Sequence, residues 1–214
     1  MSSDEARPRR LTRAEAKART RTLLLEAAAR EFARKGFAGA SVDDIAESAG
    51  FSAGALYSNF ASKDELFVEL LSSRRSARMA DALSILSDDA STLGEVRSAL
   101  SRHLVNIADK DTDLAPLEAE FWLYAIRRPE FGEHLVAQFC SNRDALASVL
   151  GEWSSKRGRP ESGPFENVAT VLLALFQGLV QLRRTDPALV PQELYGDAVR
   201  WLFAGINHSH GQSE

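Results

Sequence analysis

The chain has 214 residues, of which 44% are hydrophobic and 26% charged, so its composition is that of an ordinary globular protein. This length can hold one or two domains and is enough to bury a substantial core. The formal net charge of −4 argues against nucleic-acid binding when it is taken alone, and the single cysteine, Cys140, excludes an internal disulfide and fits a reducing compartment.

The charge is unevenly distributed along the chain. Residues 1–78 carry 14 Lys/Arg and 11 Asp/Glu, a net +3, whereas residues 79–214 carry 12 and 19, a net −7. A basic end is what phosphate binding requires. A chance asymmetry on a solvated surface explains the same numbers, so both interpretations stay open.

Neither a secretory signal nor a membrane span is expected. The first 20 residues are charged throughout and contain no apolar run. The most apolar stretch, residues 168–182, is interrupted by Thr170, Gln177 and Gln181, and it falls short of the roughly 18 continuous apolar residues that suggest a span. We therefore expect a cytoplasmic protein without membrane contact.

Residues 1–18 have the composition of a flexible arm. Five basic residues, Arg7, Arg9, Arg10, Arg13 and Lys17, lie among Ser, Pro and Ala. Such an arm either solubilises the chain or reaches DNA phosphates and the minor groove. A first helix with an apolar stripe is expected from about residue 20 to residue 35, and it ends at a glycine.

The stretch from residue 41 to residue 60 predicts a helix-turn-helix. Ser41 is suited to cap the first helix, which has apolar residues at helical spacing. Gly50 ends that helix, because a left-handed conformation costs glycine little. Ser52 caps a second, short helix that turns Leu56 and Phe60 inward. The outer side of this helix is small and polar apart from one tyrosine, which suits insertion into a major groove.

This region resembles the tetracycline-repressor (TetR) family of transcriptional regulators. The resemblance lies in LLEAA at 24–28, FARKGF at 32–37, SVDDIA at 41–46, AG at 49–50, LYSNF at 56–60 and SKDEL at 62–66, which is roughly the first third of the chain. It implies a dimer that binds DNA through this region and senses a small molecule in its C-terminal body. It also implies that Tyr57 and Lys63 contact the DNA backbone.

The candidate DNA-binding residues come from the caps, the second helix and the basic flanks. They are Ser41, Ser52, Ala53, Gly54, Ala55, Tyr57, Ser58, Asn59, Lys63, Arg13 and Lys17. Many relatives have Lys or Arg where this chain has Ala53. Since alanine cannot make the bidentate contact to guanine that arginine makes, we expect recognition to depend more on apolar contacts and DNA shape.

An all-α fold is expected, with a helix-turn-helix domain of three helices followed by a larger helical domain for effector binding and dimerisation. The expected divisions are an arm (1–18), the helix-turn-helix domain (19–65), the helical body (66–207) and a polar tail (208–214). Capping boxes at residues 62–65 and 92–95 start two body helices. Further helices are expected at about 116–126, 130–156, 165–184 and 191–207, with a loop at 154–164.

No catalytic or metal-binding pattern is present. There is no Walker phosphate loop and no His-Glu-x-x-His. Four histidines and one cysteine make no recognisable ligand spacing. Glu118 and Glu120, two positions apart on a helix, point in different directions and so cannot act as an acid/base pair. We expect no enzyme activity, no metal and no cofactor.

Phe121, Trp122 and Tyr124 form the densest aromatic cluster. It is either ordinary core or the wall of a small-molecule pocket. The resemblance favours a pocket, and the ligand-binding candidates are His103, Phe121, Trp122, Tyr124, Phe139 and Phe176. The helix at 165–184 is apolar over more than one face, so it is either a buried core helix or a helix shared between the body and a second copy. The candidate dimer residues are Val168, Val171, Leu172, Leu175, Leu179, Leu202 and Phe203.

The sequence therefore predicts a ligand-responsive DNA-binding regulator, most simply a homodimeric repressor that a small molecule releases from a palindromic operator in double-stranded DNA. The alternatives are a helical ligand-binding protein or enzyme without DNA binding, and a transcriptional activator.

Overall fold

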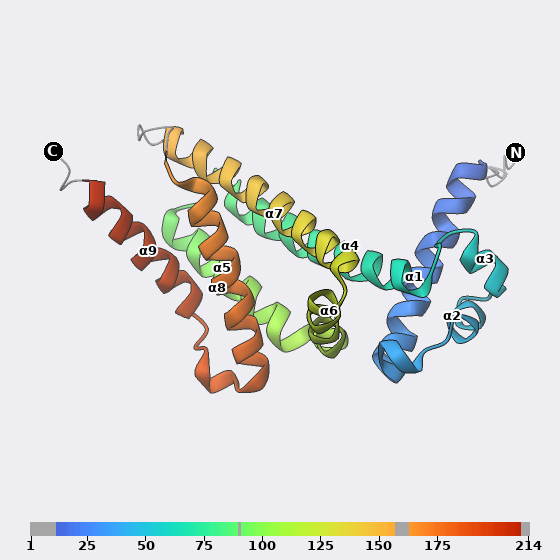
Figure 1. The fold of residues 1–214 in the computed structure, drawn as a ribbon. Coiled ribbons are helices and arrows are strands. Elements are labelled where there is room, and N and C mark those ends of the chain that lie inside the picture. The colour runs from blue at the N-terminus through green and yellow to red at the C-terminus, as the bar shows by residue number, and fades with distance from the viewer. Residues whose placement is uncertain (1–11, 90, 157–162, 211–214) are drawn as a thin grey trace, which may run out of the picture. The chain divides into compact units, whose positions relative to one another are not determined.

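The computed structural model describes residues 12–89, 91–156 and 163–210, and within these ranges the chain forms helices and no strand (Figure 1). The all-α fold class is thus confirmed. The chain divides into two compact units, residues 1–71 and 72–214.

The N-terminal unit contains α1 (Arg13–Gly39), α2 (Val42–Ser48), α3 (Ala53–Tyr57) and the first turns of α4 (Lys63–Leu86). Its core includes three aromatic rings in contact: Phe32 lies 5.5 Å from Phe67 and 5.6 Å from Phe37, centroid to centroid. Phe32 and Phe67 are buried, and Phe37 is partly buried. Leu24, Ala28, Ile45, Leu56 and Phe60 complete this core.

The first helix begins earlier than the sequence pattern predicted. Thr12 caps it, because its side chain accepts a hydrogen bond from the Glu15 N–H while the Glu15 carboxylate accepts one from the Thr12 N–H. Residues 13–18, including Arg13 and Lys17, are therefore helical and not part of an arm. Arg7, Arg9 and Arg10 lie outside the described residues. The predicted stop appears at Gly36, where φ is +70° and the helical path is broken.

The compact N-terminal unit extends past the predicted boundary at residue 65. Leu66, Phe67, Leu70 and Leu71 at the start of α4 are all buried in its core. Arg21 on α1 fixes this part of α4, because its Nε donates a 2.7 Å hydrogen bond to Glu69 and its guanidinium lies 4.0 Å from the centre of the Phe60 ring. The first two turns of α4 thus close the three-helix head.

The C-terminal unit contains the rest of α4, α5 (Leu93–Lys110), α6 (Ala115–Arg127), α7 (Pro129–Lys156), α8 (Phe165–Thr185), a short 3₁₀ turn η1 (Pro187–Leu189) and α9 (Leu194–His210). Helix α8 packs against α5, α7 and α9, and α5 packs against α9 (Figure 1). The capping box predicted at Thr92 and Glu95 starts α5. Gly196 lets α5 and α9 approach closely: a Cβ there would lie 2.9 Å from Arg97 O and from Ser101 Oγ.

Helix α8 is long and apolar enough, by length and composition, to span a membrane. One of its faces nevertheless belongs to a protein core, since Val168, Leu172, Leu179 and Val180 are buried among residues of the neighbouring helices. The opposite face leaves Val171 and Leu182 half exposed. Helix α8 is therefore apolar on two faces, as its sequence indicates, but other helices of the same chain cover only one of these faces.

Candidate DNA-binding surface and effector cavity

Helix α2 ends in the turn before α3 with a Schellman motif at Gly50. The Phe51 N–H donates to Ala46 O at 2.8 Å, and the Gly50 N–H donates to Glu47 O at 2.9 Å, which is the Schellman pattern. Gly50 has φ +77°, a conformation that costs other residues energy, although a Cβ there would have open space. Backbone conformation, and not crowding, therefore requires this glycine.

The short helix α3 presents an exposed outer face. Ser52 caps it by accepting a hydrogen bond from the Ala55 N–H at 3.2 Å, and Leu56 is fully buried. Tyr57 is 56% exposed. The Ser58 hydroxyl and the Asn59 amide both donate to Ala55 O at 2.8 Å, so these two side chains are held against their own helix. Tyr57 is the long side chain that α3 offers to solvent.

The other DNA-binding candidates lie around this face or apart from it. Arg13, Lys17, Ser41, Ser52 and Gly54 are exposed, whereas Ala53 and Ala55 are partly buried. Arg13 and Lys17 belong to the first turns of α1. The structure thus leaves these basic groups in solvent, where they are available to phosphates.

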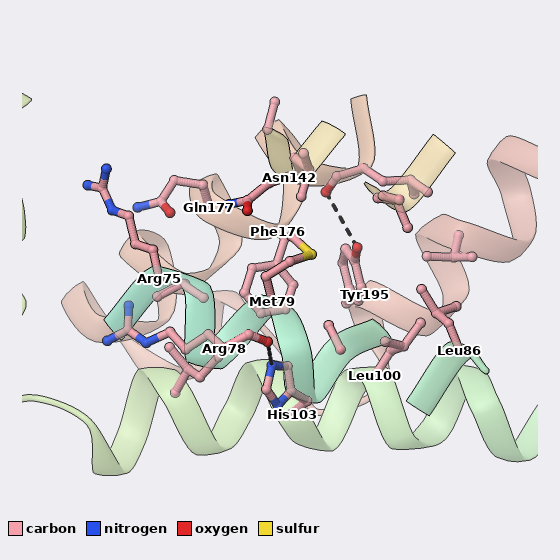
Figure 2. Close-up of a pocket in the computed structure, with 18 of the residues that line it drawn as sticks. Arg75, Arg78, Met79, Leu86, Leu100, His103, Asn142, Phe176, Gln177 and Tyr195 are labelled. Carbon is pink, nitrogen blue, oxygen red and sulfur yellow. Dashed lines mark hydrogen bonds between the residues drawn. The ribbon is translucent and has the colours of Figure 1, made fainter. Parts of the chain in front are cut away.

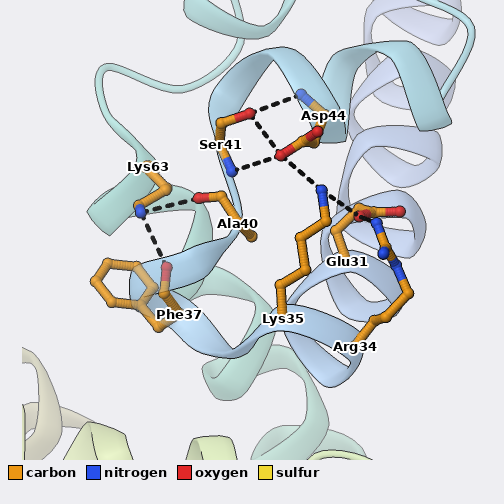
Figure 3. A network of polar contacts seen from close by, with 8 residues as sticks. All are labelled: Glu31, Arg34, Lys35, Phe37, Ala40, Ser41, Asp44 and Lys63. Carbon is orange, nitrogen blue, oxygen red and sulfur yellow. Dashed lines mark hydrogen bonds and ion pairs between the residues drawn. The ribbon is translucent and has the colours of Figure 1, made fainter.

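Lys63 has a role that the sequence did not reveal. Its ammonium group donates to Phe37 O at 2.9 Å and to Ala40 O at 3.0 Å, and it lies 4.5 Å from the centre of the Phe37 ring (Figure 3). Lys63 therefore satisfies carbonyl groups at the C-terminal end of α1. A contact of the same ammonium with DNA stays a prediction.

A second polar network joins α1 to the start of α2. The Lys35 ammonium lies 2.8 Å from the Asp44 carboxylate, which also accepts hydrogen bonds from the Ser41 hydroxyl and backbone N–H (Figure 3). Ser41 in turn accepts from the Asp44 N–H at 3.0 Å. Lys35, followed by Ser41, lowers the pKa of Asp44 from its ordinary value. The predicted cap at Ser41 is thus one half of a reciprocal capping box.

A cavity of about 510 Å³ lies inside the C-terminal unit, a volume typical of small-molecule sites (Figure 2). Four of the six ligand-binding candidates line it: His103, Trp122, Phe139 and Phe176. The other two, Phe121 and Tyr124, are not among its lining residues. Phe121 is 98% buried in the core beneath Arg75, and Tyr124 packs under Arg128, whose guanidinium lies 4.8 Å from its ring.

The polar end of the cavity contains a charge cluster that the sequence analysis missed. Glu118 is only 2% exposed and pairs with Arg184 at 2.8 Å and with Arg78. Arg78 also pairs with Asp111 at 2.6 Å. The sequence did contain an indication of this cluster, because Glu118 shares the apolar face of α6 with Phe121, three positions later. A carboxylate on a buried face demands cationic partners.

Two further groups in the cavity wall are uncharged. The His103 Nε2 lies 3.1 Å from Arg78 O, and since a carbonyl can only accept, Nε2 carries the proton. Burial lowers the pKa of His103, which favours the neutral ring. The Tyr195 hydroxyl donates to Leu172 O at 3.4 Å, and burial raises the pKa of this phenol. The described residues contain no cluster of His, Cys, Asp and Glu that could hold a metal ion.

The candidate dimer residues divide between the core and the surface. Val168, Leu172 and Leu179 are buried within one chain, while Leu175, Leu202 and Phe203 are partly buried. Only Val171 is exposed, at 50%. The exposed apolar face runs instead along Val171, Ala174, Gly178 and Leu182 on α8 and includes Trp201 on α9. The dimer residues stay a prediction.

A capped helix-turn-helix in a small helical head, followed by a helical body, defines a class of helix-turn-helix DNA-binding regulators. The family model of the bacterial regulatory proteins of the tetR family matches residues 24–70. The head of this chain, residues 24–70, is therefore of the TetR type, and the chain as a whole is similar to helix-turn-helix transcriptional regulators.

Similar proteins agree with this assignment. YfiR of Bacillus subtilis (strain 168), an uncharacterized HTH-type transcriptional regulator, is 27% identical over 164 residues, which are 74% of this chain and 77% of YfiR. KstR2 of Mycobacterium tuberculosis, an HTH-type transcriptional repressor, is 52% identical over 48 residues, 22% of this chain and 24% of KstR2. The crystal structure of a transcriptional regulator from Pseudomonas aeruginosa PAO1 has the same fold, with a TM-score of 0.73 at 24% identity over 98% of this chain and 99% of that one.

Proposed function

We propose that this protein is a cytoplasmic homodimeric repressor that binds a palindromic operator and is released when a small molecule enters the cavity of the C-terminal unit. The observation that carries the proposal is the combination of an exposed α3 face in the head with a cavity of about 510 Å³ in the body. Repression, as opposed to activation, is favoured by the identity of 52% over 48 residues with the repressor KstR2.

The head contacts DNA through α3 and the first turns of α1. Tyr57 makes a backbone contact, while the small side chains of Ala53 and Ala55 allow α3 to approach the base edges closely. Arg13 and Lys17 add phosphate contacts that carry affinity and not sequence choice. Two heads related by a two-fold axis would require an operator with the same symmetry.

The test is binding to a short operator selected from genomic fragments. Tyr57→Ala should weaken binding about tenfold, because a phosphate hydrogen bond is lost. Leu189→Ala is the matched control, since Leu189 is equally exposed at 56% but lies in the C-terminal unit. It should bind like the wild type. A protein that selects no fragment at all would favour the alternative of a helical ligand-binding protein without DNA binding.

The sign of regulation needs a separate measurement. A reporter gene downstream of the selected operator should be silenced by the wild-type protein and not by Tyr57→Ala. A reporter that the wild-type protein switches on would instead establish an activator and overturn the repressor proposal.

A further inference from the structure

Arg75 is a cation in the cavity wall that makes no direct ion pair among the described residues, although the Glu118 carboxylate attracts it at longer range. Its Nη2 is buried and makes no hydrogen bond within the described residues. The guanidinium instead lies against two aromatic rings, 5.1 Å from the centre of Phe121 and 5.6 Å from that of Trp122. Burial lowers the pKa of Arg75, but an arginine stays protonated in proteins.

The charges around Arg75 do not balance. The neighbouring cluster contains two carboxylates, Glu118 and Asp111, and these are already shared by two other arginines, Arg78 and Arg184. Three guanidinium groups thus face two carboxylates, which leaves one positive charge at Arg75. Arg75 is partly buried, and its Nη2 is removed from water without a hydrogen bond. Burying part of a cation in this way is costly, whereas a charge-assisted pair with an anion is among the strong polar contacts.

The cavity continues from Arg75 as an apolar channel. Arg75, Met79, Ala82 and Leu86 follow one another along a single face of α4, over 11 residues or about 16 Å of helix. Figure 2 shows Arg75, Arg78 and the Gln177 amide at one end, Met79 and Phe176 in the middle, and Leu86 and Leu100 at the other end. One end of the cavity therefore offers a cation and an amide, and the rest offers hydrocarbon and aromatic surface.

We propose that the cavity binds an elongated apolar molecule with a single anionic head group, such as a carboxylate, whose head pairs with Arg75 and whose body lies along α4 toward Leu86. This inference rests on the proposed effector site and names the chemical class of its ligand. A monoanion matches the single unbalanced charge. A neutral ligand would leave Arg75 without a direct ion pair, and a cation would be repelled by it.

The test is calorimetric titration of the full-length protein, without DNA, with three probes of equal chain length: dodecanoate, dodecanol and dodecylamine. Dodecanoate should bind about ten- to a hundredfold more tightly than dodecanol, because a hydrogen-bonded charge pair is worth that factor. Dodecylamine should bind more weakly than dodecanol. Equal affinity for dodecanoate and dodecanol, or no binding of dodecanoate, would overturn the proposal.

Variants show whether the preference for dodecanoate depends on Arg75 itself or on the positive charge of α4 in general. Arg75→Gln should bring the affinity for dodecanoate down to that for dodecanol, while Arg75→Lys should retain most of the preference. Arg74→Gln removes the same charge one position away from an exposed side chain, and should bind like the wild type. Circular dichroism checks that each variant is folded. An equal loss for both probes in a folded Arg75→Gln would also overturn the proposal.

Failure of this inference is distinguishable from failure of the proposed function. The titration contains no DNA, so its outcome concerns only the chemistry of the cavity. A protein that selects an operator but ignores dodecanoate would keep the regulator and reject the anionic ligand. A protein that binds dodecanoate through Arg75 but selects no DNA would do the reverse.

Discussion

The Lys63 ammonium group caps the C-terminal end of α1 in the head. Its two hydrogen bonds to Phe37 O and Ala40 O satisfy carbonyls that the helix leaves without partners. Lys63→Ala should lower the free energy of unfolding of the head by about 1–2 kcal/mol, because hydrogen bonds from a charged donor are lost. Urea denaturation measures this, and Lys17→Ala, which removes an exposed lysine from the same unit, should leave stability unchanged.

The same variant also tests whether Lys63 contacts DNA. If it neutralises a phosphate, the slope of log affinity against log salt should fall by about 1 in Lys63→Ala. A loss of stability with an unchanged salt slope would assign Lys63 to the fold alone. An unchanged stability would contradict the capping role.

Asp44 makes the head sensitive to acid. Lys35, and then Ser41, hold the pKa of this carboxyl below its ordinary value of 3.8. A depressed folded pKa means that the ionised carboxylate stabilises the head above pH 3.8, and that this contribution is lost as the pH falls below that value. Asp44→Asn should therefore be less stable than the wild type near pH 7, and the difference should shrink below about pH 4.

Thermal unfolding of both proteins across this pH range provides the measurement. Asp43→Asn is the control, because it removes the same charge from the same helical turn but leaves the Lys35 pair intact. If Asp43→Asn reproduces the whole pH effect, helix-dipole electrostatics and not the Lys35 network is responsible.

Single residues show where sequence reasoning succeeds and where it stops. The caps at Ser41, Ser52 and Thr92 follow from local chemistry within three residues, and all three were predicted. The Glu118 cluster was not, because its partners lie 40 and 66 residues away along the chain. Local pattern fixes helix starts, whereas a buried ion pair depends on which helices pack together.

At the scale of elements, the helices were predicted with errors of a few residues, apart from the earlier start of α1. The faces that they bury were harder to assign. Helix α8 is apolar on both sides, so hydrophobicity alone could not separate the face against α5 and α7 from the exposed one. Phe121 and Trp122 posed the same problem, since neighbours in sequence point to different sides of a helix.

The exposed apolar face of α8 and α9 predicts the dimer contact. Val171, Leu182 and Trp201 are 50%, 48% and 56% exposed, and an apolar patch of this kind marks an interaction surface. The wild-type protein should sediment at about twice the chain mass of 23.5 kDa. Trp201→Asp and Val171→Asp should shift it toward the monomer, because each would bury an unpaired carboxylate.

Ile126→Asp is the matched control for the dimer, since Ile126 on α6 is 79% exposed and lies outside this face. It should sediment like the wild type. A wild-type monomer, or a dimer that tolerates aspartate at both interface positions, would show that α8 and α9 do not form the contact.

At the scale of the whole molecule, α4 is the element that belongs to both units. Its first residues, up to Leu71, lie in the core of the head, and Arg75, Met79 and Leu86 further along line the cavity. A ligand can change DNA affinity only by favouring one of two states of the protein. We expect α4 to transmit this preference, because a continuous helix behaves as a stiff rod over a few turns.

Weakening α4 at the boundary between the units should therefore uncouple them. The double substitution Ser72→Gly/Ser73→Gly costs helix stability of about 1 kcal/mol per residue relative to alanine, and it changes neither the α3 face nor the cavity lining. Operator affinity is measured with and without a ligand that releases the wild-type protein. The ratio of the operator affinity without ligand to that with ligand, typically 5–150-fold in such systems, should fall toward 1 in this variant. The separate affinities of the free protein for DNA and for ligand should change little.

The control is Ser72→Ala/Ser73→Ala, which strengthens the helix at the same positions and should keep the wild-type ratio. Equal ratios in the glycine and alanine variants would show that the signal reaches the head by another route.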